Sequence, residues 1–347
     1  MNIAFFVSNH GYGHLMRELP VIAELLDRGH KVVLVTAEKH LRLSENYLKE
    51  HTAGKLITVA DEVDVGIIVK PGTLLADWDA MKKSLRAFIS SWPEKQKMAK
   101  KIFTDYSIDR VLADIVPWAI PAAKEMNIPV YLSSNFTWLE QYEGNLPLDV
   151  LQPFRECYAK PDKVFFQALA SERMRSRYSD GTDVGFFCRP FNEAAVKAIR
   201  ARYKLPVVYV SVGGSNSGID ETVEVGSLPY EFIVTFGLKF TGSNVTCLPV
   251  ETDNTNDYIA AADYCITKAG WGTIAEEMIA GKKTALINRP DVPEDMDNIA
   301  GLDGRAIGVD ISELKHPERI IEKLKAMDEP GKSKNNYKAV ADLITAL

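Results

Sequence analysis

The sequence predicts an α/β protein that contains two doubly wound parallel sheets in two domains. Its 347 residues suggest about two domains, and a hydrophobic content of 46% is sufficient for two packed cores. Short β-branched runs alternate with helical stretches along both halves of the chain. Because parallel strands need crossover connections, this alternation predicts parallel sheets with helices on both faces.

In the first half, strands are expected where β-branched and aromatic residues cluster. They are Ile3–Val7, Lys31–Thr36, Val111–Asp114, Val130–Ser133 and Val164–Gln167, with helices around 81–103 and 117–126. Pro20 fits the first turn of a helix but not its interior. We therefore expect the first helix to begin near Arg17, which would leave 9–16 as an exposed loop at the end of the first strand.

The second half contains another series of strands, which predicts the second sheet. Its members are Val207–Val212, Phe232–Thr235, Val245–Leu248, Tyr264–Thr267 and Thr284–Asn288. The last stretch places Tyr337, Val340, Ile344 and Leu347 on one helical stripe, which must bury a face. We expect domains at 1–190 and 191–332, and a helix at 333–347 that packs back on the first domain.

Composition and charge exclude several classes of protein. There are 41 basic and 47 acidic residues, and the formal charge of −6 argues against a nucleic-acid partner. No apolar run is long enough for a transmembrane segment, and no leader precedes the first strand, so a cytoplasmic protein is expected. The four widely spaced cysteines match no zinc pattern and suggest reduced thiols.

The stretch from Tyr264 onward reads as a strand, a glycine loop and a helix, with Gly270 and Gly272 in the loop. In such a unit, a ligand binds beyond the carboxyl end of the strand, near the amino terminus of the helix. The carboxylate of Glu276 could accept hydrogen bonds from both hydroxyls of a ribose, each worth about 1.5–3 kcal/mol. Thr273 and Glu276 also match a capping box, so both interpretations stay open.

A second glycine cluster follows the first strand of the second half. Gly213 and Gly214 allow backbone N–H groups to form a concave anion site, and Ser215 and Ser217 can add hydroxyl donors. A tight turn is the structural alternative. The cluster is not a nucleotide-triphosphatase P-loop, because that pattern ends in Gly-Lys-Ser/Thr and here Ile219 occupies the lysine position.

The loop after the first strand carries the best candidate for a general base. A neutral His14 could take a hydroxyl proton near pH 7, with His10 and Arg17 in the same loop. Asp114 ends another predicted strand and could orient the imidazole. A purely structural histidine is the alternative.

Other motifs give weaker evidence of function. Gly11 and Gly13 suggest a dinucleotide fingerprint, but Met16 holds the third glycine position, which disfavours a dehydrogenase.

Asn135 and Trp138 follow a strand of the first half, where an aromatic ring could stack on a sugar or simply pack in the core. Two Asp-x-Asp tripeptides, at 77–79 and 295–297, are common by chance, and no metal is assigned to them.

With these motifs placed, the chain resembles the GT-B glycosyltransferases over nearly its whole length. The resemblance rests on Gly213-Gly-Ser, Gly270-x-x-Thr273-x-x-Glu276, Asp295-x-x-Asn298 and the Gly13-His14 pair. It is also similar to the glycosyltransferase-like amino-terminal half of plant L-arabinokinases, through His10-Gly-x-Gly-His14-x-x-Arg17, Asn135-Phe-x-Trp138 and Lys268-x-Gly-Trp-Gly-Thr273. Trp271 departs from the small residue usual at its position.

The resemblance implies that the two domains face each other across a cleft and bind different substrates. The first domain would hold the acceptor, with His14 as base beside Asp114, and with a cleft lined by His10, Gly13, Arg17, Asn135 and Trp138. The second domain would bind the donor through Gly213, Gly214, Ser215, Ser217, Lys268, Gly270, Gly272, Thr273, Glu276, Asp297 and Asn298.

The expected activity is metal-independent and cofactor-free transfer of a sugar, of the hexosyl type, from a nucleoside-diphosphate sugar. A UDP-sugar is favoured, inversion is expected, and the acceptor would be a small molecule, a glycan or a lipid-linked hydroxyl. Two alternatives stay open: a nucleotide-sugar-binding protein without transfer activity, and a GT-B enzyme that epimerises or hydrolyses the donor.

Overall fold

The computed structural model describes residues 1–71, 73, 75–212, 222–289 and 292–346, and these divide into two compact units. The first unit consists of Met1–Ile68, Ala76–Gly185 and Asn336–Leu347. The second consists of Val69–Leu75 and Phe186–Asn335. The chain therefore enters the second unit twice, at Val69–Leu75 and at Phe186–Asn335, and returns to the first unit each time.

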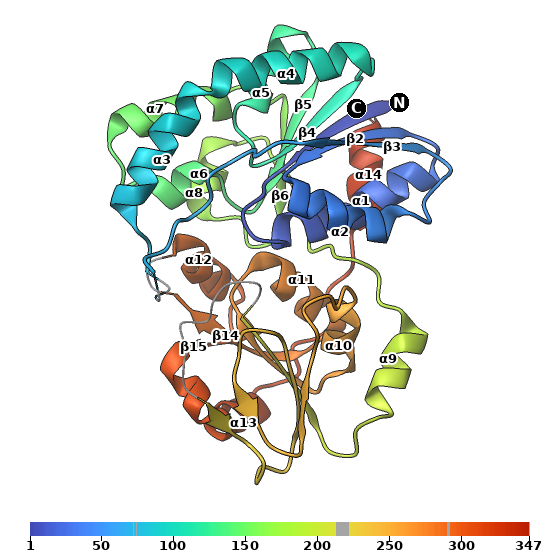
Figure 1. The fold of residues 1–347 in the computed structure, drawn as a ribbon, viewed down its shortest axis with the longest axis vertical. Helices are drawn as coiled ribbons and strands as arrows, with labels where there is room; N and C mark the ends of the chain where they lie inside the picture. The colour runs from blue at the N-terminus through green and yellow to red at the C-terminus, as the bar shows by residue number, and fades with distance from the viewer. Residues whose placement is uncertain (72, 74, 213–221, 290–291, 347) are drawn as a thin grey trace. The chain divides into compact units, whose positions relative to one another are not determined.

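The first unit is a parallel sheet of seven strands with helices on both faces, as Figure 1 shows. The strand order is β3-β2-β1-β4-β5-β6-β7. The elements are β1 Asn2–Val7, α1 Gly13–Asp27, β2 Lys31–Thr36, α2 Glu38–Leu48, β3 Lys55–Ala60, α3 Trp78–Ser90, α4 Trp92–Asp105, β4 Arg110–Asp114, α5 Ala119–Glu125, β5 Val130–Ser134, α6 Trp138–Tyr142, α7 Leu148–Tyr158, β6 Lys163–Gln167, α8 Glu172–Arg177, β7 Thr182–Gly185 and α14 Tyr337–Ala346.

In the first sheet, the chain adds β2 and β3 on one side of β1 and adds β4 to β7 on its other side. The switch point therefore lies between β1 and β4. Ligands of doubly wound folds bind beyond the carboxyl ends of the strands at such a switch point. In the parallel register, Val7 at the end of β1 pairs with Asp114 at the end of β4. The loop after β1 and the last residue of β4 therefore meet where a ligand is expected.

Alternation along the strands divides the first unit into two faces. Phe6 and Val35, for example, point to one face, where they pack in a buried cluster with residues of α3, α4, α5 and α7. Phe6 makes edge-to-face ring contacts with Phe103 and Trp118 at centroid distances of 5.9 and 5.4 Å. This packing fixes the sheet edge that carries the candidate site.

Helix α1 begins earlier than the sequence predicted. It starts at Gly13, and the Met16 backbone N–H already donates to the Tyr12 carbonyl at 2.9 Å. The prediction of an exposed loop up to residue 16 is therefore wrong, and His14 is buried in the first turn of the helix. Pro20 lies inside the helix, where its ring removes one backbone hydrogen bond. The almost fully buried apolar face of α1 offsets that loss.

The second unit is a parallel sheet of six strands in the order β12-β10-β8-β13-β14-β15, with a separate pair β11-β9. Its switch point lies between β8 and β13. The two parallel sheets confirm the predicted α/β fold class. The elements are α9 Glu193–Arg200, β8 Val207–Ser211, β9 Val223–Glu224, β10 Glu231–Val234, β11 Phe240–Thr241, β12 Val245–Cys247, α10 Thr255–Ala261, β13 Tyr264–Lys268, α11 Trp271–Ala280, β14 Lys283–Asn288, α12 Pro293–Gly301, β15 Ile307–Asp310, the 3-10 helix Ile311–Lys315 and α13 Pro317–Lys325.

Among the described residues, no helix combines the length and the apolar character needed to cross a bilayer.

The last helix, α14, packs against α1 within the first unit, as Figure 1 shows. Val340 and Ile344 are fully buried in this contact. At its rim, Arg28 of α1 pairs with Asp342 through Nη1 and Oδ1 at 2.6 Å. The carboxyl-terminal helix therefore supports the helix that carries His14.

Replacing Ile344 by alanine removes buried methyl groups from this contact and should lower the free energy of unfolding by about 2–5 kcal/mol. Urea denaturation measures the loss. Asp342→Ala is the matched control on the same helix, because its carboxylate is 65% exposed and a surface pair contributes at most about 1 kcal/mol. Equal stability of Ile344→Ala and the wild type would contradict the packing described here.

Candidate active site

The carboxyl edge of the first sheet holds a buried cluster of charged side chains around Asp114. Its Oδ1 lies 2.9 Å from Nδ1 of His14, and its Oδ2 accepts from Nε of Arg17 at 3.0 Å. Nη2 of Arg17 also contacts Oδ1 of Asp114 and lies 2.7 Å from Nδ1 of His14. One carboxylate therefore binds both the arginine and the imidazole.

Asp114 is fully buried, and yet the pKa of its carboxyl is lowered. Burial alone would raise its pKa, but the adjacent Arg17 guanidinium and His14 hold the pKa of the carboxyl below its usual value. The ionised carboxylate is the form that can orient an imidazole by accepting from it. The structure thus brings together the two residues that the sequence suggested as base and orienting acid.

Two further predicted residues lie beside this cluster. The amide oxygen of Asn135 accepts from Nη1 of Arg17 at 3.2 Å, so Asn135 helps to hold the guanidinium. Trp138 is only 1% exposed, and Tyr142 stacks on its ring with centroids 5.3 Å apart and planes 9° apart. Trp138 is a core residue, and the prediction that it contacts a sugar is wrong.

Hydrogen bonds connect the loop after β1 to the segment that follows β3. The side-chain oxygen of Asn9 accepts from the backbone N–H groups of Val63 and Asp64 at 2.7 and 3.1 Å. The hydroxyl of Ser8 donates to the Asp64 carboxylate at 2.5 Å. Nδ1 of His10 accepts from the Ile67 backbone N–H at 3.3 Å. A neutral His10 therefore carries its proton on Nε2.

Gly13, the remaining first-unit candidate, is the exposed first residue of α1. Its neighbour Gly11 has φ +65°, a conformation that favours glycine. The Gly11 carbonyl accepts from Nε2 of His40 at 2.6 Å. This contact fixes the turn that leads into the His14 helix.

In the second unit, helix α11 follows β13 through a short glycine loop. Gly270 is the N-cap, and the Ile274 N–H donates to its carbonyl at 3.1 Å. Gly272 and Thr273 lie in the first turn, whereas Glu276 lies in the second. Glu276 is therefore too far along the helix to cap it, and the capping-box interpretation is wrong.

Glu276 is paired with an arginine that the sequence did not single out. Its Oε1 lies 3.2 Å from Nη2 of Arg189, and both side chains are buried. Burial raises the pKa of Glu276, and the Arg189 charge opposes that rise. Sequence separation hides this pair, because the two residues are 87 positions apart.

Two basic residues lie at the carboxyl ends of β13 and β14. Lys268 is the last residue of β13, and Arg289 directly follows β14. Burial, followed by repulsion from Arg289, lowers the pKa of Lys268 to about 8. Arg289 makes a two-bond pair with Asp295, with both distances 2.7 Å. The lysine therefore remains the more weakly neutralised cation at this edge.

The other predicted donor ligands differ in accessibility. Asn298 is fully buried, and its amide donates to the Ala269 carbonyl at 3.0 Å, beneath the glycine loop. Asp297 is half-buried on α12. The cluster of Gly213, Gly214, Ser215 and Ser217 lies outside the described residues.

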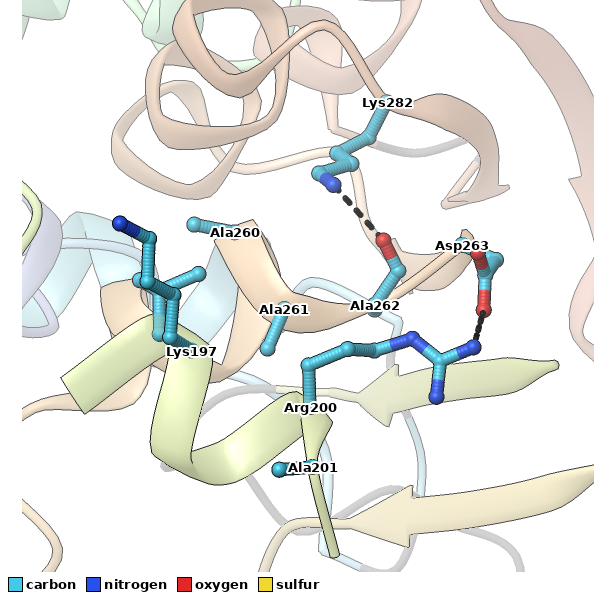
Figure 2. A pocket seen from close by; sticks show the side chains of 9 residues that line it. Lys197, Arg200, Ala201, Ala260, Ala261, Ala262, Asp263 and Lys282 are labelled. Atoms are coloured by element: carbon cyan, nitrogen blue, oxygen red, sulfur yellow. Dashed lines mark hydrogen bonds and ion pairs between the residues drawn. The ribbon is translucent and has the colours of Figure 1, made fainter. Parts of the chain in front are cut away.

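The second unit has a hollow at the amino-terminal ends of β13 and β14, and Figure 2 shows the side chains that line it. Helix α9 and the carboxyl end of α10 form its walls. Its cations are already engaged: Nζ of Lys282 donates to the Ala262 carbonyl at 2.7 Å, and Arg200 lies 3.6 Å from Asp263. Asp263 precedes β13, whereas the donor motif follows it, so this hollow is separate from the candidate site.

The sequence also missed two buried acids near His14. Glu18 lies on α1 and is fully buried, and burial followed by the Asp114 charge raises its pKa well above the usual value. A charged residue between the apolar positions 15 and 19 was a signal that could have been used. Asp64 stands in a run of acidic residues, and nothing in the sequence marks it as buried.

Burial raises the pKa of Asp64 from 3.8 to about 6, against the opposing hydrogen bond from Ser8. A carboxyl whose pKa is higher in the folded state loses its contribution to stability as pH rises through that value. We therefore expect Asp64→Asn to match the wild type near pH 4 and to exceed it by about 1–3 kcal/mol above pH 6.

Urea denaturation across this pH range tests the prediction. Asp149→Asn is the control, because Asp149 is 57% exposed in its pair with Arg86 and its removal should leave no such pH trend. A constant difference between Asp64→Asn and the wild type at every pH would contradict the prediction.

Comparisons with known proteins now bear on this site. Residues 1–152 match the model of glycosyl transferase family 1, and residues 211–345 match the glycosyltransferase family 28 C-terminal domain. The chain is 26% identical to an uncharacterized glycosyltransferase of Methanosarcina mazei, covering all of this chain and 95% of the relative. It is 24% identical to the L-arabinokinase of Arabidopsis thaliana over 79% of this chain, but spans only 27% of that protein's length.

Solved structures show the same fold. The calicheamicin glycosyltransferase superimposes with a TM-score of 0.67 at 15% identity, covering 99% of this chain and 97% of that chain. Arabidopsis thaliana UGT89C1 complexed with UDP-L-rhamnose gives 0.63 at 12% identity, covering 99% and 94%. The two family matches identify glycosyltransferase domains in both halves of the chain, and its fold is that of the GT-B class.

Proposed function

We propose that the chain is a metal-independent, inverting transferase that moves a hexosyl group from a UDP-sugar to an acceptor hydroxyl. The observation that carries the proposal is the contact between His14 and Asp114 at the switch point of the first sheet. A histidine held by a buried carboxylate is the arrangement that general-base catalysis requires. The UDP-sugar is favoured because a structure of the same fold holds UDP-L-rhamnose.

His14 is the better base of the two histidines near the first strand. In the tautomer whose Nδ1 proton is donated to Asp114, Nε2 carries the lone pair that can accept a proton, whereas the Arg17 Nη2 donor, 2.7 Å from Nδ1, opposes that tautomer. His10 has the opposite arrangement, because its Nδ1 lone pair is already used by the Ile67 N–H. Asp114, held by Arg17, would then stabilise the imidazolium that forms.

The reaction proceeds by a single displacement. Nε2 of His14 removes the proton of the acceptor hydroxyl, whose oxygen forms a bond to the anomeric carbon of the donor. The bond from that carbon to the diphosphate oxygen breaks, and UDP leaves with the electron pair. Lys268 and the amino terminus of α11 would stabilise the negative charge that develops on the diphosphate.

Replacing His14 by alanine should lower turnover by about 10²–10⁴-fold and leave UDP affinity unchanged, because only the proton acceptor is lost. The assay measures UDP released from the UDP-sugar and acceptor pair that gives turnover with the wild type. His51→Ala is the matched control, since His51 lies 2.9 Å from Asp27 at the surface of the same unit. Near-normal turnover of His14→Ala would contradict the assignment of His14 as the general base.

The same assay separates the alternatives. A binding protein would bind the donor without releasing UDP, and a hydrolase or epimerase would form product when no acceptor is added. Transfer that depends on both acceptor and His14 is the outcome that the proposal expects.

For the donor, we expect a thermal shift with UDP and one UDP-sugar, because a ligand at a hundred times its Kd stabilises a fold by about 2.7 kcal/mol. Glu276→Ala should abolish the shift, since the ribose hydroxyls lose a charged acceptor. Glu313→Ala is the control, because that carboxylate pairs with Lys323 at the surface of the same unit. A shift with NAD and none with any nucleotide sugar would contradict the proposal.

A further inference from the structure

The segment that leads into the second unit is held rigidly on both sides of Arg189. The Cys188 N–H donates to the Asn335 side chain at 3.1 Å, and the Asn335 amide donates back to the Cys188 carbonyl at 2.9 Å. Beyond Arg189, the Pro190 carbonyl accepts from the Asn256 amide at 3.2 Å. The side chain of Arg189 therefore projects from a fixed stretch of backbone.

The same segment is packed against the helix that carries Glu276. Phe186 and Phe187 contact the ring of Trp271, with centroids 6.0 and 5.4 Å apart. Trp271 is the first residue of α11. The ring contacts thus fix the distance between Arg189 and the second turn of α11.

The guanidinium of Arg189 is oriented by three acceptors. It donates to the Asp253 carbonyl, it lies 3.5 Å from the hydroxyl of Thr255, and its Nη2 lies 3.2 Å from Oε1 of Glu276. Glu276 has two carboxylate oxygens, and one is fixed by this pair. The pair therefore holds one carboxylate oxygen, Oε1, in place before a donor arrives.

We propose that Arg189 is a positioning residue, which holds Glu276 ionised and correctly oriented so that its carboxylate can accept the ribose hydroxyls of the donor. The inference rests on the proposed function, because it assumes that Glu276 binds the ribose. It adds a residue from the connecting segment that neither the motifs nor the comparisons identify.

The charges around Glu276 explain why it needs this partner. Burial and, after it, the charge of Asp257 of α10 raise the pKa of Glu276 and so disfavour its ionised form. Burial keeps Cys188 and Tyr209, which also face the carboxylate, neutral by raising their pKa values. Arg189 is the cation that opposes these effects. Without this cation, the pKa of Glu276 would rise further, so its ionised form would be favoured only at higher pH.

The test is UDP affinity by calorimetry near pH 7 and near pH 9, each variant being compared with the wild type at the same pH. Arg189→Gln keeps hydrogen-bonding groups but removes the charge. It should bind UDP about tenfold or more weakly near pH 7 and should approach the wild type near pH 9, as Glu276 ionises. Arg189→Met should show the same trend, and Arg189→Lys should stay close to the wild type at both pH values.

Arg305→Met is the matched control from the same unit. Arg305 donates to the Pro330 carbonyl at 3.3 Å and to the Ser333 hydroxyl at 2.9 Å, and its loss should leave UDP affinity unchanged. The double variant Arg189→Gln with Glu276→Gln should bind weakly without pH dependence.

A loss of affinity in Arg189→Gln that is equal at both pH values would overturn the inference and would indicate a direct or structural role for the arginine. Failure of the proposed function looks different. In that case the wild type would bind no UDP, or Glu276→Gln alone would retain wild-type affinity.

Discussion

The first unit depends on how the buried charge of Asp114 is compensated. An unpaired carboxylate in a protein interior costs several kcal/mol, so Asp114 requires partners. Arg17 supplies a two-bond contact and His14 supplies its ring nitrogen. The end of β4 and the first turn of α1 are thereby tied together, and this contact orients the imidazole.

The second unit uses the same principle at the carboxyl end of its sheet. Glu276 and Asp295 are buried acids, and each is paired with an arginine. Lys268 is compensated less, and in the proposed reaction its charge would stabilise the leaving diphosphate. Charges that are held in place before the reaction require no reorganisation when negative charge develops. Catalysis without a metal is consistent with this arrangement.

The sequence predicted the inner strands of both large sheets, because buried parallel strands read as short β-branched runs, such as Lys31–Thr36. It missed the edge strands β3, β7 and β15. It misplaced the start of α1, because tertiary packing tolerates Pro20 inside the helix. The residues of the glycine-loop motif were visible locally. Arg189 was not, because its role depends on a contact across 87 residues, and burial of Trp138 likewise depends on tertiary packing.

The central claim is a single displacement in which His14 acts as the base. The most direct test is the anomeric configuration of the glycoside formed on the acceptor, determined by proton NMR. A single displacement predicts a configuration opposite to that of the donor. Retention of configuration would require a second displacement or another route, and would contradict the account.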